Sequence, residues 1–249
     1  MFPFKDNIPT DRTPVVTIAL IVTNVLMYFL FQQGTILGGP DDENVVLYGA
    51  IPFELTNFAQ QCVTIAGNEL TTGSCAGQPP TWLTVLTSMF MHGGVLHLGG
   101  NMLFLWVFAN NVEDSMGRVR FLGFYLLGGL AATALQTAVG PDSVVPTIGA
   151  SGAVSAVLGG YILLYPRARV WTLLFVVVFF TVLNLPALAV LGLWFLQQLA
   201  FAAFDVVNPT GEEGGVAYFA HIGGFLFGLA LIKIFAQRAK RSPSRHAVY

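Results

Sequence analysis

The chain has 249 residues, of which 55% are hydrophobic and only 10% are charged, and its formal net charge is −2. A water-soluble domain carries about 25% charged residues, so this composition excludes an ordinary soluble protein. No nucleotide-binding loop or nucleic-acid signature is present, so we expect a membrane protein without a nucleic-acid partner.

Six apolar runs approach the roughly 20 residues that a helix needs to cross a bilayer. In chain order they cover residues 14–31, 92–109, 121–139, 146–165, 185–204 and 216–235. They predict an all-α, polytopic membrane protein built as a six-helix bundle. The expected organisation is a cytoplasmic segment 1–13, a membrane domain 14–236 and a basic cytoplasmic tail 237–249. The first run is not read as a cleaved signal peptide, because no small-residue cleavage site follows it directly.

A further apolar run at residues 170–183, "VWTLLFVVVFFTVL", has only 14 residues, and Asn184 and Pro186 interrupt it. A run of this length is too short for an ordinary span. We expect it to be re-entrant, interfacial or wedged within the protein.

The charge distribution supports six spans. With six, all 11 Lys and Arg residues fall on one side, and the loops on the other side carry nine of the 13 Asp and Glu residues. A seventh span at 170–183 would break this separation. The positive-inside rule therefore predicts a multi-pass protein of the cell membrane with both termini in the cytoplasm.

The first external loop, residues 32–91, contains both cysteines of the chain, Cys62 and Cys75. An oxidising compartment would allow a disulfide between them. Two free thiols fit the sequence equally well, so the sequence leaves the pairing open.

Polar residues at membrane depth are candidates for function because burying them in lipid is unfavourable. Ser151 and His221 each lie five residues inside an expected span that enters from outside, about 7 to 8 Å deep at 1.5 Å per residue. His97 and Asn101 lie in the outer part of the second span. Three helices thus bring four polar side chains to one level.

The helix faces predict that Ser151 and His221 meet. Each lies in line with small residues that allow two helices to approach closely: Ser155 and Gly159 in the fourth span, Gly224 and Gly228 in the sixth. A histidine beside a serine can remove the hydroxyl proton during attack on a carbonyl. His97, Asn101 and the backbone N–H of Ser151 are then candidate donors to the oxyanion that forms.

Other functions remain open at this point. An isolated serine in a span often serves packing, and a lone histidine often serves a structural hydrogen bond or proton transfer. A metal site at His92, His97 and His221 would lack a nearby carboxylate, so we expect no metal and no cofactor. A channel or transporter would be expected to have intramembrane carboxylates or an internal repeat, which we do not find in the sequence.

Three segments resemble motifs of the rhomboid family of intramembrane serine proteases. They are "HGGVLHLGGN" at 92–101, "GASG" at 149–152 and "AHIGGFLFG" at 220–228. The resemblance implies that Ser151 is the nucleophile and His221 the general base, with His97 and Asn101 at the oxyanion. The resemblance also implies supporting roles for five further residues: His92, Gly149, Gly152, Gly224 and Gly228.

The resemblance also implies a rhomboid-like fold whose active site opens to the external side and whose long first loop lies partly in the outer leaflet. The implied partners are the lipid bilayer and transmembrane protein substrates, which would enter beside the fifth span. A catalytically inactive relative that only binds transmembrane segments is the alternative. Ser155 is a departure, because some members carry there an aromatic residue that stacks on the catalytic histidine. Tyr218 is a candidate to orient His221 in its place.

Overall fold

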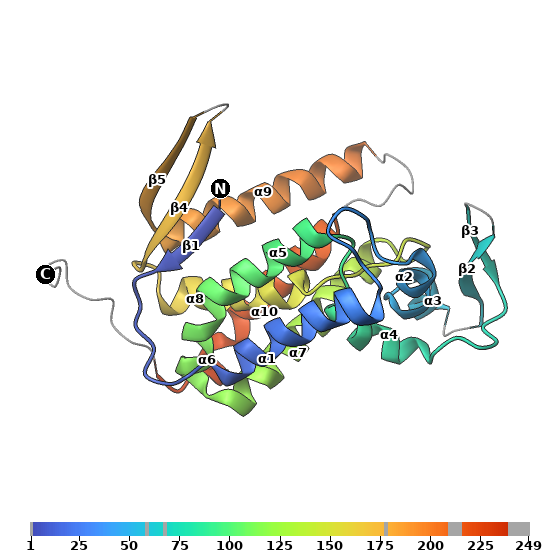
Figure 1. Ribbon diagram of the computed structural model, residues 1–249, viewed down its shortest axis with the longest axis horizontal. Coiled ribbons are helices and arrows are strands. Elements are labelled where there is room, and N and C mark those ends of the chain that lie inside the picture. The colour runs from blue at the N-terminus through green and yellow to red at the C-terminus, as the bar shows by residue number, and fades with distance from the viewer. Residues whose placement is uncertain (1, 58–59, 67–68, 177–178, 209–215, 239–249) are drawn as a thin grey trace, which may run out of the picture.

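A computed structural model describes residues 2–57, 60–66, 69–176, 179–208 and 216–238. The chain is mostly helical. A helical bundle lies between a three-stranded sheet at one end and a two-stranded hairpin at the other (Figure 1). The bundle consists of α1 (Val15–Leu26), α5 (Val95–Phe104), α6 (Asn110–Met116), α7 (Arg118–Val139), α8 (Ser151–Leu164), α9 (Ala187–Val207) and α10 (Tyr218–Phe235).

Four helical stretches of the described chain are long and apolar enough to cross a membrane: Val95–Met116, Arg118–Val139, Ala187–Val207 and Tyr218–Phe235. The first of these combines α5 and α6, which a π-helical turn at Leu105–Ala109 joins. The protein is therefore a multi-pass membrane protein. Two further expected spans form shorter apolar helices, Val15–Phe31 and Ser151–Leu164, so six full-length spans are not found.

The sequence predicts that the fourth span starts at residue 146, and this is wrong, because the helix begins at Ser151. Thr147 instead pairs with Ala50 in an isolated antiparallel bridge. Gly149 has a φ of 126°, which L side chains rarely adopt and which does not belong to a helix. Ser151 therefore lies at the start of the helix and not five residues inside it.

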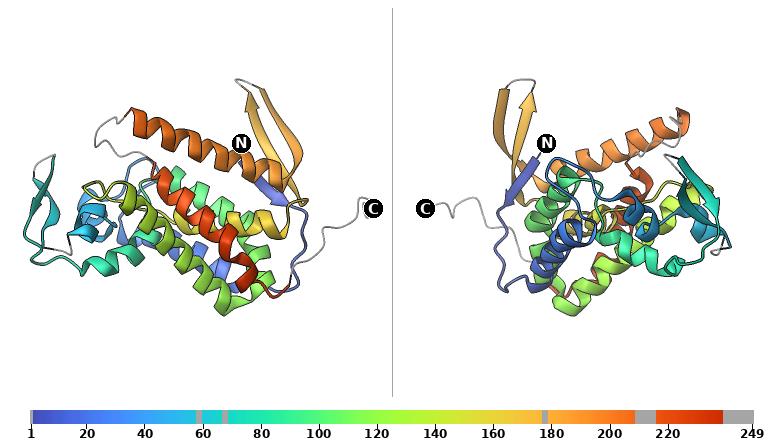
Figure 2. Two further views of the ribbon diagram at one scale, coloured as in Figure 1. Left: turned by 180° about the vertical axis from the view of Figure 1, so that it is seen from behind. Right: turned by 45° about the vertical axis from the view of Figure 1, so that its right-hand side comes forward.

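The short α8 is the central helix of the bundle. All of its residues from Gly152 to Ile162 are buried, and α7 and α10 pack against it. Figure 2 shows from two further directions that α9 lies on the outside of the bundle. Among the four candidate spans, α9 is also the least buried.

The expectation of an all-α chain is wrong, because the described residues include five strands. Strands β1 (Phe2–Asp6), β4 (Arg169–Val176) and β5 (Phe179–Pro186) form an antiparallel sheet in the order β1-β4-β5. The short apolar run at 170–183 is thus a hairpin that pairs with the N-terminal segment. Its β-branched and aromatic residues favour strands, a preference that an assessment by length alone overlooks.

The described parts of segment 32–91 lie largely at the opposite end of the bundle (Figure 1), and Met89 near the end of the segment is buried in the main core. The segment contains α2 (Asp42–Tyr48), α3 (Pro52–Thr56), β2 (Cys62–Ala66), β3 (Glu69–Gly73) and α4 (Thr81–Thr87). Val46, Ile51 and Val63 are buried together in its core. A disulfide joins Cys62 to Cys75, which answers the question that the sequence left open.

Candidate active site

Ser151 and His221 come together where α8 and α10 begin. Ser151 is the first residue of α8, and His221 lies in the first turn of α10. The Oγ atom of Ser151 is 2.8 Å from Nε2 of His221, which is hydrogen-bond distance. A hydroxyl and an imidazole in this contact can exchange a proton.

Glycines bring the two helices close enough for this contact. A β-carbon on Gly224 would lie 2.0 Å from the carbonyl oxygen of Gly152, and one on Gly228 would lie 2.0 Å from that of Ala156. Any larger residue at Gly224 or Gly228 would collide with the α8 backbone, so α8 and α10 touch along the predicted small-residue faces.

Gln198 of α9 holds the far side of the imidazole, a contact that sequence reasoning missed. Its Oε1 atom is 2.8 Å from Nδ1 of His221, and Gln198 is only 6% exposed. A carbonyl oxygen only accepts hydrogen bonds, so Nδ1 carries the proton and Nε2 is left free to accept from Ser151. The Trp194 ring, one turn earlier on α9, lies 5.9 Å from the imidazole ring.

Tyr218, the expected orienting residue, is a weaker neighbour of His221. The two rings stand edge-on with their centroids 6.5 Å apart. Ser155 turns away from the imidazole, because its hydroxyl donates to the backbone carbonyl of Ser151 at 2.6 Å. The aromatic and amide contacts to His221 therefore come mainly from α9.

His97 lies over the backbone just before Ser151. A β-carbon on Gly149 would be 2.9 Å from Nε2 of His97, so only glycine leaves space for the ring there. The N–H of Gly93 donates to Nδ1 of His97 at 3.4 Å, which leaves the proton of the neutral ring on Nε2. The Nε2 edge of the His97 ring lies beside Gly149, two residues before Ser151.

Asn101 and His92 both contact His97. The Asn101 amide donates to the His97 carbonyl at 3.1 Å. In the described part of the chain no hydrogen bond links Asn101 to Ser151 or His221. The His92 ring packs edge-on against His97 at 5.1 Å, and Gln32 holds the His92 backbone through bonds of 2.8 and 3.2 Å.

Within the described residues, no three His, Cys, Asp or Glu side chains gather in a group that could hold a metal ion. The structure brings Ser151, His221 and the Gln198 amide into a chain of hydrogen bonds. His97 lies beside the backbone that precedes Ser151.

Known proteins carry the same domain. A family model described as the Rhomboid domain matches residues 79–238. Presenilin-associated rhomboid-like protein A, mitochondrial, of Danio rerio is 34% identical over 155 residues, which cover 59% of this chain and 36% of that protein. Rhomboid protein 1, mitochondrial, of Saccharomyces cerevisiae is 30% identical over 156 residues, 59% of this chain and 40% of that protein.

The alignment with a bacterial relative is longer. Rhomboid protease GluP of Bacillus subtilis is 30% identical over 220 residues, 88% of this chain and 35% of that protein. The alignments thus span about 35 to 40% of the length of these three relatives. Because the domain match covers well over half of its residues, the chain belongs to the rhomboid family.

Proposed function

We propose that this chain is an intramembrane serine endopeptidase that cleaves transmembrane segments of other membrane proteins. The observation that carries the proposal is the 2.8 Å contact between Ser151 Oγ and His221 Nε2, with Gln198 fixing the imidazole from behind. A serine that served only helix packing would need neither an imidazole nor an amide behind it.

In the proposed reaction, Ser151 attacks the scissile carbonyl while its hydroxyl proton passes to Nε2 of His221. The resulting imidazolium gives that proton to the leaving amine, and an acyl-enzyme remains on Ser151. Water then attacks the ester with His221 again acting as base, which releases the second product and restores the serine. No cofactor is needed for these steps.

The oxyanion of each tetrahedral intermediate would lie between His97 and the start of α8. The Nε2–H of His97 is one proposed donor. The backbone N–H of Ser151 is another, because the first N–H groups of a helix have no carbonyl within the helix to bind. Asn101 would join them by turning its amide from the His97 carbonyl. Asn101→Ala should therefore keep reaction with a serine-directed probe but lower turnover by about 10² to 10³-fold.

Substrate entry requires two changes. A transmembrane helix hides its carbonyls in its own hydrogen bonds, so the substrate must unwind near the cut. The substrate must also pass between helices, and α9 is the proposed gate because it lies outside the bundle and is the least buried candidate span (Figure 2). Opening α9 would also move Gln198, so the gate and the catalytic base would be coupled.

The proposed location is the cell membrane. Both termini and the loops that carry the Lys and Arg residues would lie in the cytoplasm, and the active site would open to the outside. GluP, the bacterial relative, aligns over 88% of this chain, whereas the two mitochondrial relatives each align over 59%. The division into segment 1–13, membrane domain 14–236 and tail 237–249 remains part of the proposal. Most of that tail, from residue 239, lies outside the described residues.

Cleavage of a model transmembrane substrate in detergent or liposomes tests the proposal. The parent should cut the substrate, and Ser151→Ala and His221→Ala should not. Ser155→Ala is the matched control, because it removes from the same helix a serine hydroxyl whose hydrogen bond goes to a backbone carbonyl and not to an imidazole.

If Ser151→Ala and His221→Ala cleave as well as the parent, the assignment is wrong. If the parent binds the substrate but never cuts it, the chain is instead an inactive rhomboid-like binder of transmembrane segments.

A further inference from the structure

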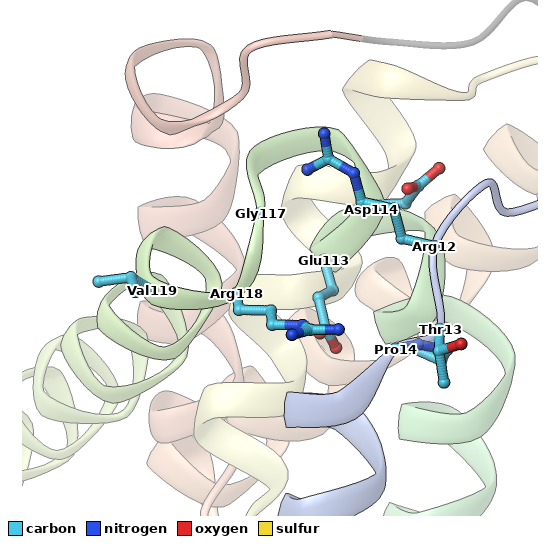
Figure 3. Close-up of a pocket in the computed structure, with 8 residues that line it drawn as sticks. All are labelled: Arg12, Thr13, Pro14, Glu113, Asp114, Gly117, Arg118 and Val119. Atoms are coloured by element: carbon cyan, nitrogen blue, oxygen red, sulfur yellow. The ribbon is translucent and has the colours of Figure 1, made fainter.

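The turn between α6 and α7 contains a pocket of about 340 Å³ that the proposed peptidase reaction does not use. Three segments meet there: the chain before α1, the end of α6 and the start of α7 (Figure 3). Its lining residues are Arg12, Thr13, Pro14, Glu113, Asp114, Gly117, Arg118 and Val119. Gly117 makes the turn with a φ of 83°, a conformation that favours glycine.

Two arginines of this pocket are not paired with another residue in the described part of the chain. Arg12 and Arg118 are both exposed, and neither forms a hydrogen bond or ion pair with any other residue that the structure describes. The Nη1 atom of Arg12 lies 3.9 Å from where a β-carbon on Gly117 would be, so this side chain folds over the turn towards the start of α7.

The two acids of the pocket are already engaged by other groups. Glu113 accepts three hydrogen bonds at the first turn of α1, two of them from the backbone N–H and hydroxyl of Thr17 at 2.8 Å each. Asp114 forms an ion pair with Arg238. These contacts stabilise the start of α1 and the chain after α10, and neither Arg12 nor Arg118 takes part in them, although the Arg118 side chain lies beside Glu113 (Figure 3).

The pocket lies at the boundary of the apolar part of the bundle. The turn at Gly117 separates the candidate spans Val95–Met116 and Arg118–Val139. Val119 and Leu122, three residues apart on one face of α7, are 86% and 40% exposed. Figure 3 shows Val119 pointing away from the two arginines. A charged pocket therefore opens beside an apolar helix surface.

We propose that the Arg12–Arg118 pocket binds the phosphate of an anionic phospholipid. Guanidinium groups pair with phosphate oxygens through two parallel hydrogen bonds. Basic pockets between transmembrane helices are suited to anionic headgroups. The exposed Val119 and Leu122 would contact the acyl chains, which a free phosphate ion cannot use. This inference does not depend on whether the chain is a peptidase.

Native mass spectrometry of the full chain in detergent tests the inference. Dioleoylphosphatidylglycerol is titrated against the parent, with dioleoylphosphatidylcholine as the zwitterionic reference and inorganic phosphate as the soluble alternative. Arg12→Gln/Arg118→Gln should bind phosphatidylglycerol about 25-fold more weakly, roughly 5-fold for each arginine. The matched control, Arg120→Gln/Arg167→Gln, removes the same charge from exposed residues outside the pocket lining and should bind within about 2-fold of the parent.

Three results would overturn the inference: equal weakening in both double variants, no weakening in either, or arginine-dependent binding of inorganic phosphate without arginine-dependent binding of lipid. Thermal unfolding in phosphatidylcholine checks that the variants are folded. If the pocket double variant is unstable there, Arg12→Gln alone makes the comparison, because Arg12 lies before α1 and outside every helix.

Discussion

Replacing Gln198 by leucine tests how the imidazole of His221 is held. The amide oxygen is 2.8 Å from Nδ1 and is buried, and leucine keeps much of the volume while removing the acceptor. The Nδ1–H would then be buried without a partner, which costs about 1 to 3 kcal/mol. If the same amount is added to the activation free energy of the step in which His221 acts as base, turnover falls by about 5-fold to 150-fold.

The assay compares kcat and KM for a small soluble ester and for a transmembrane substrate. Gln198→Leu should lower kcat for both substrates, because the fault lies in the base and not in substrate entry. Gln198→Glu keeps an acceptor and adds a charge that favours the imidazolium. The acidic limb of its pH–rate profile should therefore move to higher pH. Gln197→Leu is the control, because Gln197 is exposed and has no side-chain hydrogen bond with a described residue.

Parent-like kcat in Gln198→Leu together with an unmoved pH profile in Gln198→Glu would refute this reasoning. The same loss in Gln197→Leu would also refute it, since it would show a general disturbance of α9. A purely structural role of Gln198 would lower the thermal midpoint without moving the pH profile.

Three further predictions concern packing, pH and the disulfide. Gly224→Ala puts a methyl group 2.0 Å from backbone oxygen and should lower stability by about 1 to 3 kcal/mol in thermal unfolding, whereas Gly192→Ala, with nothing within 4 Å, should not. Burial raises the pKa of Asp6 to about 6, so its charged form opposes docking of β1. Stability is lost as pH rises from 3.8 through 6. After correction for the pH dependence of intrinsic amide exchange, the protection of β1 amides should be greater at pH 5 than at pH 8 by about 1.4 kcal/mol. Asp6→Asn should remove that difference, and an equal difference in the variant would count against it. Cys62→Ser/Cys75→Ser should make the hairpin between the two positions more sensitive to limited proteolysis, because the disulfide constrains that local loop. Probe labelling at the active site should not change. Proteolysis at the rate of the parent would contradict this prediction.

The residues of the candidate site could be identified from the sequence because membrane burial makes polar side chains rare. Ser151 and His221 stood out in apolar runs, and the glycines in line with them predicted close helix packing. That packing is found at Gly224 and Gly228, where an added β-carbon would collide with the α8 backbone.

The contact of Gln198 could not be predicted in the same way. Gln197 and Gln198 are adjacent, so composition gives no reason to choose between them, and only the rotation of α9 about its axis decides which one faces His221. That rotation is set by packing across the whole helix, to which Trp194 and the rest of α9 contribute.

The strands were missed for a different reason. The length of the run at 170–183 argues against a membrane span but does not indicate a strand, and its partner β1 lies more than 160 residues earlier in the sequence. Pairing between segments so far apart leaves no local pattern. The start of α8 is not predicted correctly because residues 146–150 are mostly apolar yet precede the helix, held by the bridge between Thr147 and Ala50 and by the φ of Gly149.

The most direct test of the central claim is to map the site of fluorophosphonate modification by peptide mass spectrometry in the parent and in His221→Ala. We predict an adduct on Ser151 of the parent and a labelling rate at least about 10²-fold lower when the imidazole is removed. An adduct on another residue, or an equal rate at Ser151 in the two proteins, would contradict the claim that His221 activates this serine.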